Sequence, residues 1–153
     1  MLKNIYRRGF LAQLLAVCAW PFAPARGADV GSESVEAMVR KVTGGAKVET
    51  GRVKLELPVL ADNGNSVSLK VNVDSPMTPA NYVKSIHIYA ARNPRPNVAN
   101  FYLGPRAGRA QLSTRVRLGG SQRVLALVAL SDGTFWSATA DVVVTLSACY
   151  DAT

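Results

Sequence analysis

Alternating apolar and polar positions run through most of this chain and predict a domain built mainly from β-strands. After one short segment with a helical repeat, hydrophobic side chains recur at every second position, as in strands that bury one face. Gly, Pro, Asn and Asp residues separate these segments and favour turns between them. The clearest example is 66–73, where Val67, Leu69, Val71 and Val73 alternate with polar residues.

The same alternation predicts about seven short strands. Besides 66–73, the expected strands cover residues 53–59, 86–90, 101–103, 112–118, 124–130 and 136–146. Residues 124–130 are all apolar, as in a central strand that is buried on both faces. Turns are expected at 62–65 and 132–133. Short strands with a turn about every ten residues predict an immunoglobulin-like antiparallel β-sandwich.

One short helix is expected before the strands. Apolar residues recur with helical spacing between Val35 and Val42 and form a single stripe. Either Ser32 or Ser34 can cap the start of this helix, and Gly44-Gly45 can end it in a left-handed turn.

Residues 1–28 have the features of an export signal rather than of the fold. Lys3 and a pair of arginines precede an uncharged apolar stretch at 9–22. Small residues then offer a cleavage site at 23–25, with Ala28 as a second option. The apolar stretch is too short for a membrane span, so the mature protein is expected to lie outside the membrane.

The arginine pair of this signal, Arg7 and Arg8, is followed after one residue by Phe10-Leu11, an order that resembles the twin-arginine export motif. We therefore expect export to the periplasm by the twin-arginine pathway. An ordinary general-export signal is the alternative. A lipoprotein cut before Cys18 is a weaker one, because Val17 is large where that motif has a small residue. The twin-arginine pathway carries folded proteins, so a partner protein exported with this chain is expected.

The chain is basic, with a formal net charge of +8 at pH 7 that falls to about +5 when Lys3, Arg7 and Arg8 are removed. Seven arginines are scattered along the second half of the sequence, at Arg92, Arg95, Arg106, Arg109, Arg115, Arg117 and Arg123. Nucleic acid is not an expected partner, because its binding needs a dense basic stripe with interleaved aromatic residues. These arginines form either an ordinary solvated face or a docking surface for acidic partners or anionic substrates.

No set of catalytic residues can be assembled, so neither an enzyme nor a cofactor or metal site is expected. His87 is the only histidine, which excludes most histidine-based nucleophile and metal chemistry. It is out of phase with Ile86 and Ile88 and is expected to be exposed. Asp62 and Asp132 are expected to form turns through local hydrogen bonds to the backbone.

The mature chain keeps one cysteine, Cys149, four residues before the last residue of the sequence. An unpaired thiol is unusual in an oxidising compartment. Few tertiary contacts hold the end of a domain. We therefore expect residues 147–153 to form a flexible arm and Cys149 to be a covalent attachment point.

Six short stretches lie in order along the expected domain at residues 29–146. They are Leu55-Glu56-Leu57-Pro58, Ala61-Asp62-Asn63-Gly64, Asn93-Pro94, Ser113-Thr114-Arg115-Val116-Arg117-Leu118, Asp132-Gly133 and Val142-Val143-Val144-Thr145. Together they resemble SoxY, the sulfur-carrier subunit of the bacterial Sox thiosulfate-oxidation system.

The resemblance implies a fold, partners and a site. SoxY proteins fold as an immunoglobulin-like sandwich and form a heterodimer with SoxZ, a second sandwich subunit that is exported with them. A cysteine on the C-terminal arm is conjugated to thiosulfate-derived sulfur. The adduct then visits the haem, manganese and molybdenum enzymes of the system, while the carrier itself is not catalytic. By position, Cys149 corresponds to that cysteine.

The arm departs from the family pattern, in which pairs of glycines flank the cysteine. Here Ser147 and Ala148 precede Cys149, and Tyr150 follows it. Glycine gives a slim and flexible backbone, whereas Tyr150 adds a ring beside the sulfur. Two hypotheses follow from this departure. Either the protein is a working or divergent sulfur carrier, or it is a SoxY-like binding or structural paralogue that keeps the partner interface without efficient carrier function.

Overall fold

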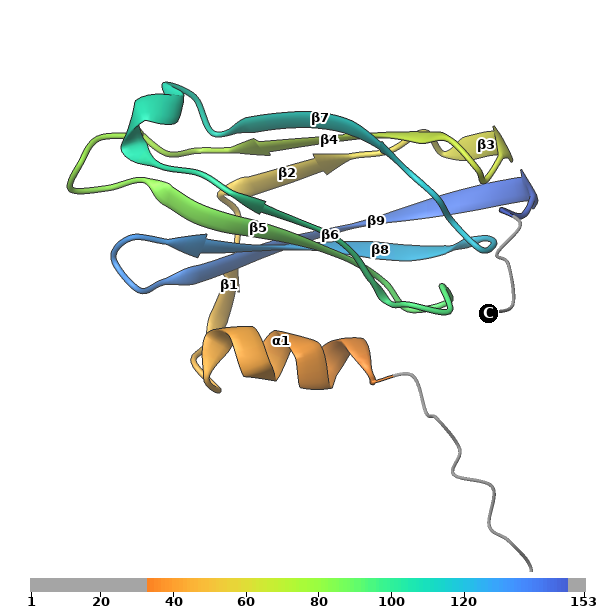
Figure 1. Cartoon of the computed structure of the whole chain (residues 1–153), viewed down its shortest axis with the longest axis horizontal. Coiled ribbons are helices and arrows are strands. Elements are labelled where there is room, and N and C mark those ends of the chain that lie inside the picture. Colours follow the sequence, from red (N-terminus) through yellow and green to blue (C-terminus); the bar gives the residue numbers. More distant parts are fainter. Residues whose placement is uncertain (1–32, 149–153) are drawn as a thin grey trace, which may run out of the picture. The chain divides into compact units, whose positions relative to one another are not determined.

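The computed structural model describes residues 33–148, which form two packed β-sheets and one α-helix (Figure 1). Helix α1 spans Val35–Thr43, and a short 3-10 helix, η1, spans Pro105–Ala107. The strands are β1 (Val48–Thr50), β2 (Val53–Glu56), β3 (Leu60–Asn63), β4 (Val67–Val73), β5 (Val83–Ala90), β6 (Asn97–Tyr102), β7 (Gln111–Val116), β8 (Gln122–Leu130) and β9 (Phe135–Leu146). The predicted β-sandwich with a short helix before its strands is confirmed.

The larger sheet has the strand order β1-β9-β8-β5-β6, and β3 pairs with the later part of β9. The smaller sheet has the order β2-β4-β7 and is antiparallel throughout. As predicted, β8 is a central strand, and its hairpin with β9 turns at 131–133. The long strand β9 therefore pairs with β8 on one edge and with both β1 and β3 on the other.

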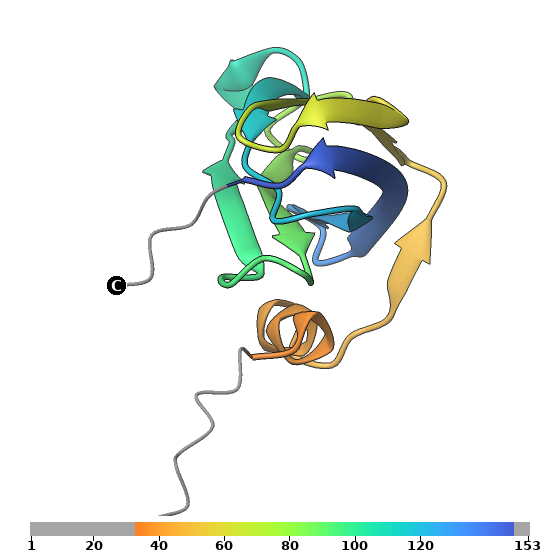
Figure 2. The same ribbon diagram turned by 90° about the vertical axis from the view of Figure 1, so that its right-hand side faces the viewer.

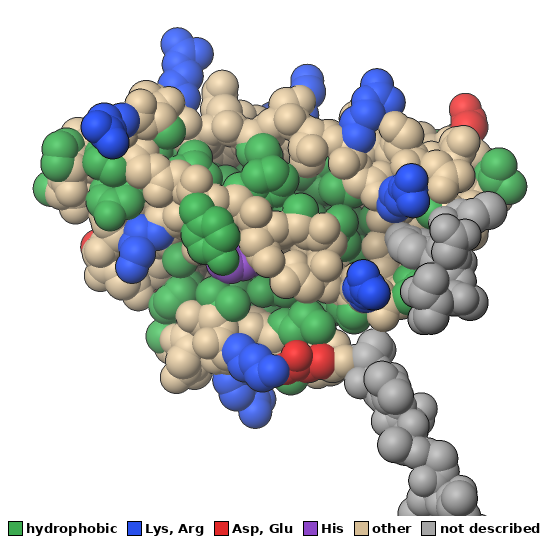
Figure 3. Space-filling view, in the orientation of Figure 1, with side chains coloured by type: hydrophobic (Ala, Val, Ile, Leu, Met, Phe, Trp, Pro, Cys, Tyr) green, Lys and Arg blue, Asp and Glu red, His purple; other side chains and the backbone are tan. Residues whose placement is uncertain are grey.

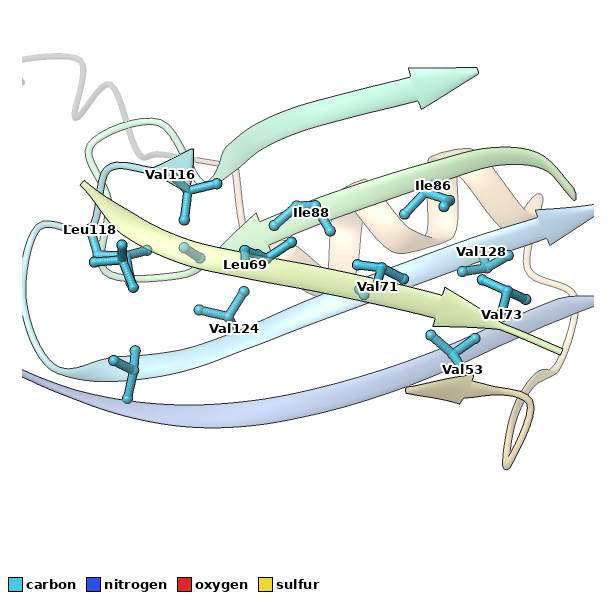
Figure 4. Close-up of a cluster of buried hydrophobic side chains, with 14 of the residues drawn as sticks. Val53, Leu69, Val71, Val73, Ile86, Ile88, Val116, Leu118, Val124 and Val128 are labelled. Carbon is cyan, nitrogen blue, oxygen red and sulfur yellow. The ribbon is translucent and has the colours of Figure 1, made fainter. Parts of the chain in front are cut away.

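Hydrophobic side chains from the facing sides of the two sheets form the core (Figure 4). In β4, buried and solvent-facing residues alternate along the strand, as the sequence predicts. Leu69 and Val71 are completely buried and lie opposite Ile86, Ile88 and the β8 residues of the larger sheet. Burial of each such side chain contributes roughly 1.5–3 kcal/mol to folding.

Helix α1 begins and ends at its predicted signals. The hydroxyl of Ser34 accepts a hydrogen bond from the N–H of Ala37 at 3.2 Å, which satisfies one of the free N–H groups of the first turn. Gly44 ends the helix with φ of 63°, a left-handed conformation that glycine adopts without strain. Figures 1 and 2 show α1 beside the larger sheet, on the side away from the smaller sheet. No helix within residues 33–148 is long and apolar enough to cross a membrane.

Two strands, β1 and β3, were not predicted, and both pair in parallel with β9. Strand β1 is short and none of its residues is buried, so it carries no alternating signal. Strand β3 includes Asp62 and Asn63, which the sequence assigned to a turn; the turn itself is formed by Gly64 and Asn65. Their pairing with β9 adds parallel edges to a sandwich that was expected to be antiparallel. Periodicity fails here because each strand is only three or four residues long.

Candidate functional site

Some of the predicted site residues lie within the described structure, and others lie outside it. Cys149, Tyr150 and the signal arginines Arg7 and Arg8 lie outside the described residues. Of the predicted arm, Ser147 and Ala148 are described. The contacts that bear on function are therefore those that hold Ala148, the residue directly before Cys149.

Ala148 is held against the domain, although the sequence assigned it to a flexible arm. Its side chain is buried, with 7% of the residue exposed, whereas Ser147 is exposed. The N–H of Ala148 donates a hydrogen bond to the carbonyl oxygen of Leu118 at 3.1 Å. The fixed frame thus extends two residues beyond the predicted domain end at residue 146 and reaches the residue before Cys149.

Gly64 lies at the centre of this contact. Its N–H donates to the carbonyl oxygen of Leu146 at 2.7 Å, and its own carbonyl accepts from the N–H of Leu118 at 2.8 Å. A Cβ atom added at Gly64 would lie 2.3 Å from the carbonyl oxygen of Leu118 and 2.8 Å from the nitrogen of Ala148. Only a residue without a side chain allows these three backbone segments to approach so closely. We call Gly64, Leu118 and Ala148 the tail anchor.

A buried polar network supports the tail anchor. The side-chain carbonyl of Asn93 accepts hydrogen bonds from the N–H of Gly119 and from the side chain of Gln122, both at 2.9 Å. The amide nitrogen of Asn93 donates to the carbonyl oxygen of Arg117, also at 2.9 Å. Asn93 and Gln122 are both buried. Their bonds fix the backbone on either side of Leu118, because buried polar groups lose stability when left without partners.

Ser121 and Thr145 hold the end of β9 beside the anchor. The hydroxyl of Ser121 accepts from the N–H of Val144 at 2.8 Å and lies 3.3 Å from the Val144 carbonyl oxygen. The hydroxyl of Thr145 donates to the carbonyl oxygen of Asp62 at 2.9 Å. Asp62 therefore takes part in the β3–β9 contact. The prediction that Asp62 forms a turn is wrong. The neighbouring residue Asn63 does so, by accepting from the N–H of Asn65.

An exposed apolar patch adjoins the anchor at the β3–β9 edge. Val59 is 80% exposed, Leu60 56%, Val143 51% and Leu146 62%. Leu60 is paired with Val143 in the β3–β9 ladder, so these two side chains are neighbours, while Leu146 is paired with Asn63 at the end of the same ladder. Exposed apolar surface often marks a protein contact. We call these four residues the β3–β9 patch.

His87 is buried, and the prediction that it is exposed is wrong. Its Nδ1 lies 2.8 Å from the side-chain oxygen of Asn100, and its Nε2 lies 2.9 Å from the hydroxyl of Ser85. The rings of Tyr89 and Tyr102 contact it in stacked and edge-on geometry. The outer side of β5 is covered as well as its core side. The alternation of the strand therefore predicted the wrong exposure for His87. With both ring nitrogens engaged, His87 has a structural role.

The prediction for Asp132 is confirmed. Its carboxylate accepts from the hydroxyl of Thr134 at 2.7 Å and from the N–H of Thr134 at 2.9 Å in the β8–β9 turn. These hydrogen bonds favour the charged form and hold the pKa of Asp132 below its usual value. No group of three or more His, Cys, Asp or Glu residues that could bind a metal occurs within residues 33–148.

Sequence reasoning missed the roles of Gly64 and Asn93, although both lie in stretches that it singled out. Asp62-Asn63-Gly64 was assigned to a turn, and Asn93-Pro94 was singled out for its resemblance to the family, so neither assignment accounted for their contacts. The close approach at Gly64 involves backbone atoms from three distant segments. No local pattern reports such an approach.

Comparisons with known proteins agree with this fold. The family model described as the sulfur oxidation protein SoxY matches residues 39–149. No curated protein matches the chain. Among solved structures, the sulfur carrier protein SoxY from Chlorobium limicola f thiosulfatophilum is similar, with a TM-score of 0.61 and 23% identity over 74% of this chain and 97% of that one.

A superoxide reductase (neelaredoxin) from Ignicoccus hospitalis also matches, with a TM-score of 0.57 and 16% identity over 63% of this chain and 94% of that one. At such identities both structures show a shared immunoglobulin-like fold and nothing about chemistry. The family match covers most of the chain, including the tail anchor. The chain therefore belongs to the SoxY family.

Proposed function

We propose that this protein is a periplasmic sulfur-compound carrier, which holds thiosulfate-derived sulfur covalently on Cys149 and presents it to Sox enzymes. One observation carries the proposal: the family match runs to residue 149 and so includes the cysteine. The solved relative from Chlorobium limicola f thiosulfatophilum is itself a sulfur carrier protein. Export by the twin-arginine pathway is part of the proposal and follows from Arg7 and Arg8.

Loading requires the formation of one bond and the removal of two electrons. The Cys149 thiolate is the reactive form of the side chain. Its sulfur bonds to the outer sulfur of thiosulfate, and the product carries a terminal sulfonate group. The thiol proton passes to solvent, and the two electrons pass to a haem enzyme of the Sox system. The carrier contributes the thiol and its placement, while the partner enzymes perform the catalysis.

The tail anchor supports this division of roles. A carrier must present its sulfur at a defined place on its surface so that several enzymes can dock around it. The hydrogen bond between Ala148 and Leu118 fixes the backbone one residue before Cys149. Consecutive Cα atoms are about 3.8 Å apart, so the attachment point starts close to a fixed position of the sandwich.

The proposal includes a SoxZ-like subunit that forms a heterodimer with this chain. Export in a folded state suits a pair in which one subunit lacks its own signal. The β3–β9 patch offers exposed apolar surface that a second sandwich subunit can cover. Co-purification of the tagged chain from its own cells tests this part. Recovery of a stable monomer with no second subunit contradicts it.

Mass spectrometry of the intact protein tests the carrier role. In protein isolated from thiosulfate-exposed cells, we expect a fraction to carry added mass that is localised to Cys149. The Cys149→Ala variant is expected to lose the added mass and to abolish thiosulfate oxidation. Ser147→Ala serves as the matched control, because Ser147 is exposed beside the anchor. An unmodified Cys149 under all thiosulfate conditions, or normal oxidation by the Cys149→Ala strain, would contradict the proposal.

A second candidate is a paralogue that binds the SoxZ-like subunit but is not loaded efficiently. The observation that favours it is the large Tyr150 directly after the cysteine, where the family pattern has glycine. Under this hypothesis, replacing Tyr150-Asp151-Ala152-Thr153 with two glycines should raise the rate of loading. An unchanged rate, with wild-type protein already loaded, favours the carrier.

A further inference from the structure

Strands β6 and β7 are edge strands of the two different sheets, and an open groove of about 390 Å³ lies between them. The chain passes from β6 through η1 to β7, so the two strands border the same side of the sandwich (Figure 1). Val98, Ala99 and Val116 contribute apolar surface to the groove. The remainder of its lining is polar and strongly basic.

Three of the seven scattered arginines meet in this groove, namely Arg95, Arg115 and Arg117. Asn97 and Thr114 add polar side chains beside them. Among the described residues that line the groove, none is acidic. In the view of Figure 3, the charged side chains around this face are mostly Lys and Arg. The structure thus brings together basic residues that the sequence shows as dispersed.

Two of these arginines keep a largely uncompensated charge within the described domain. Neither Arg95 nor Arg115 forms an ion pair with a residue in 33–148. Arg115 uses one nitrogen to donate to the hydroxyl of Ser66 at 3.2 Å, and a guanidinium has five N–H donors. By contrast, Arg123 forms a two-point pair with Asp141. A concave basic surface without carboxylates concentrates a positive potential that attracts anions.

Guanidinium groups suit oxoanions in particular. Their planar N–H donors match the spacing of two oxygens on a tetrahedral anion such as sulfate or a sulfonate.

The groove and the tail anchor share a segment of backbone. Arg117 lines the groove, and its carbonyl oxygen accepts a hydrogen bond from Asn93. The next residue, Leu118, holds Ala148 through its own carbonyl. The basic groove therefore adjoins the place where the chain continues to Cys149.

We infer that the β6–β7 groove is a binding site for a sulfur oxoanion, with Arg95, Arg115 and Arg117 as its ligands. Two sources can supply this chemistry: the sulfonate end of the conjugate on Cys149, or a free anion such as sulfate. Only the first source rests on the proposed carrier function. In that case, the groove holds the charged end of the cargo against the carrier between visits to partner enzymes.

Titration of the Cys149→Ser protein with sulfate at low ionic strength tests the free anion. We expect saturable changes in the amide NMR signals of Asn97, Thr114 and Arg115. Because exposed charge contacts each contribute less than about 1 kcal/mol, Arg95→Gln and Arg115→Gln should each weaken the affinity roughly two- to fivefold. Arg106→Gln is the matched control, because Arg106 lies in η1 away from the groove lining and is exposed. It should leave the affinity unchanged.

Two conjugates of the native protein test the tethered anion. Tetrathionate converts the Cys149 thiolate to a thiosulfonate adduct and releases thiosulfate, whereas methyl methanethiosulfonate adds a neutral methylthio group and releases methanesulfinate. We expect the charged adduct to shift the amide signals of Thr114 and Arg115 and to reduce the affinity for added sulfate. The neutral adduct should do neither, and Arg115→Gln should diminish the effect of the charged one.

The outcomes separate this inference from the carrier proposal. Shifts of the groove amide signals that depend on the arginines support the site, whether sulfate or the charged adduct causes them. The anion that causes the shifts is the occupant of the groove. The inference is overturned if neither source shifts the groove signals, or if Arg106→Gln weakens binding as much as the groove variants. If Cys149 is loaded in cells but no anion shifts the groove signals, the carrier proposal stands and the oxoanion site is contradicted. If the groove binds sulfate but Cys149 is never loaded, the oxoanion site stands and the carrier proposal is contradicted.

Discussion

Strand β4 and the tail anchor both contain buried residues, but different interactions hold them. Four apolar side chains of β4 point into the core, and their burial stabilises the strand. The tail anchor instead consists of backbone groups from three distant segments, which meet at a glycine and are joined by hydrogen bonds. Side-chain burial leaves a periodic pattern in the sequence, whereas the approach of backbones leaves none. For this reason β4 was predictable from the sequence and the tail anchor was not.

The largest effect should come from the β4 side of the comparison. Leu69→Ala removes a completely buried side chain from the middle of the core and should reduce the free energy of unfolding by about 2–5 kcal/mol. Urea denaturation followed by circular dichroism measures this change. Leu60→Ala is the control, because Leu60 is 56% exposed and its truncation should change stability by less than about 0.5 kcal/mol. Equal losses for the two variants would show that side-chain burial is not what stabilises β4.

A smaller but more local effect is expected at the tail anchor. Gly64→Ala places a methyl group within contact distance of the Leu118 carbonyl and the Ala148 nitrogen, so backbone must shift, at roughly 1–3 kcal/mol. Hydrogen exchange should accelerate at the amides of Leu118 and Ala148 while the core of β4 stays protected.

Gly104→Ala is the control for this variant, because a Cβ atom there has open space and its φ is −143°. The Gly104→Ala protein should keep slow exchange at Ala148. If Gly64→Ala also left that exchange slow, the close approach at Gly64 would not be what holds the tail.

The smallest effect concerns the exposed β8–β9 turn, where hydrogen bonds form but nothing is buried. The hydrogen bonds from Thr134 lower the pKa of Asp132 in the folded protein. Its contribution to stability is therefore fully present above the unfolded value of about 4 and is lost as the pH falls through the lowered folded value. Asp132→Asn keeps an acceptor but cannot ionise, so its urea midpoint should lie slightly below that of wild type at pH 7. The two midpoints should converge in strong acid, and a gap that persisted there would exclude ionisation as its cause.

The elements with a strong repeat were predictable from the sequence. Helix α1 with its Ser34 cap, the alternating strand β4 and the central strand β8 all lie where the pattern placed them. Strands β1 and β3 were not predictable, because each is short and is defined by pairing with residues far along the chain. His87 was misplaced for a related reason, since the cover over its face of β5 comes from other parts of the fold.

The reactive group of the candidate site could be predicted from the sequence, but the contacts around it could not. A tail cysteine at residue 149 follows from the sequence and from the resemblance of the chain to its family. The contacts of Gly64, Asn93 and Gln122 that hold the preceding residue depend on loops from both sheets. The meeting of Arg95 with Arg115 and Arg117 likewise requires the loop before β6 and the end of β7 to border the same groove. Only the folded domain reveals such long-range juxtapositions.

The place of β9 in the larger sheet has a consequence for biosynthesis. It is the last strand of the domain, yet β1, β3 and β8 all pair with it. While a ribosome is still translating the segment before residue 135, the early strands β1 and β3 have no partner, and contacts so distant in sequence form slowly. Strands β1 and β3 therefore cannot join the larger sheet until β9 has been translated. The tail position before Cys149 becomes fixed only in a domain that has finished folding.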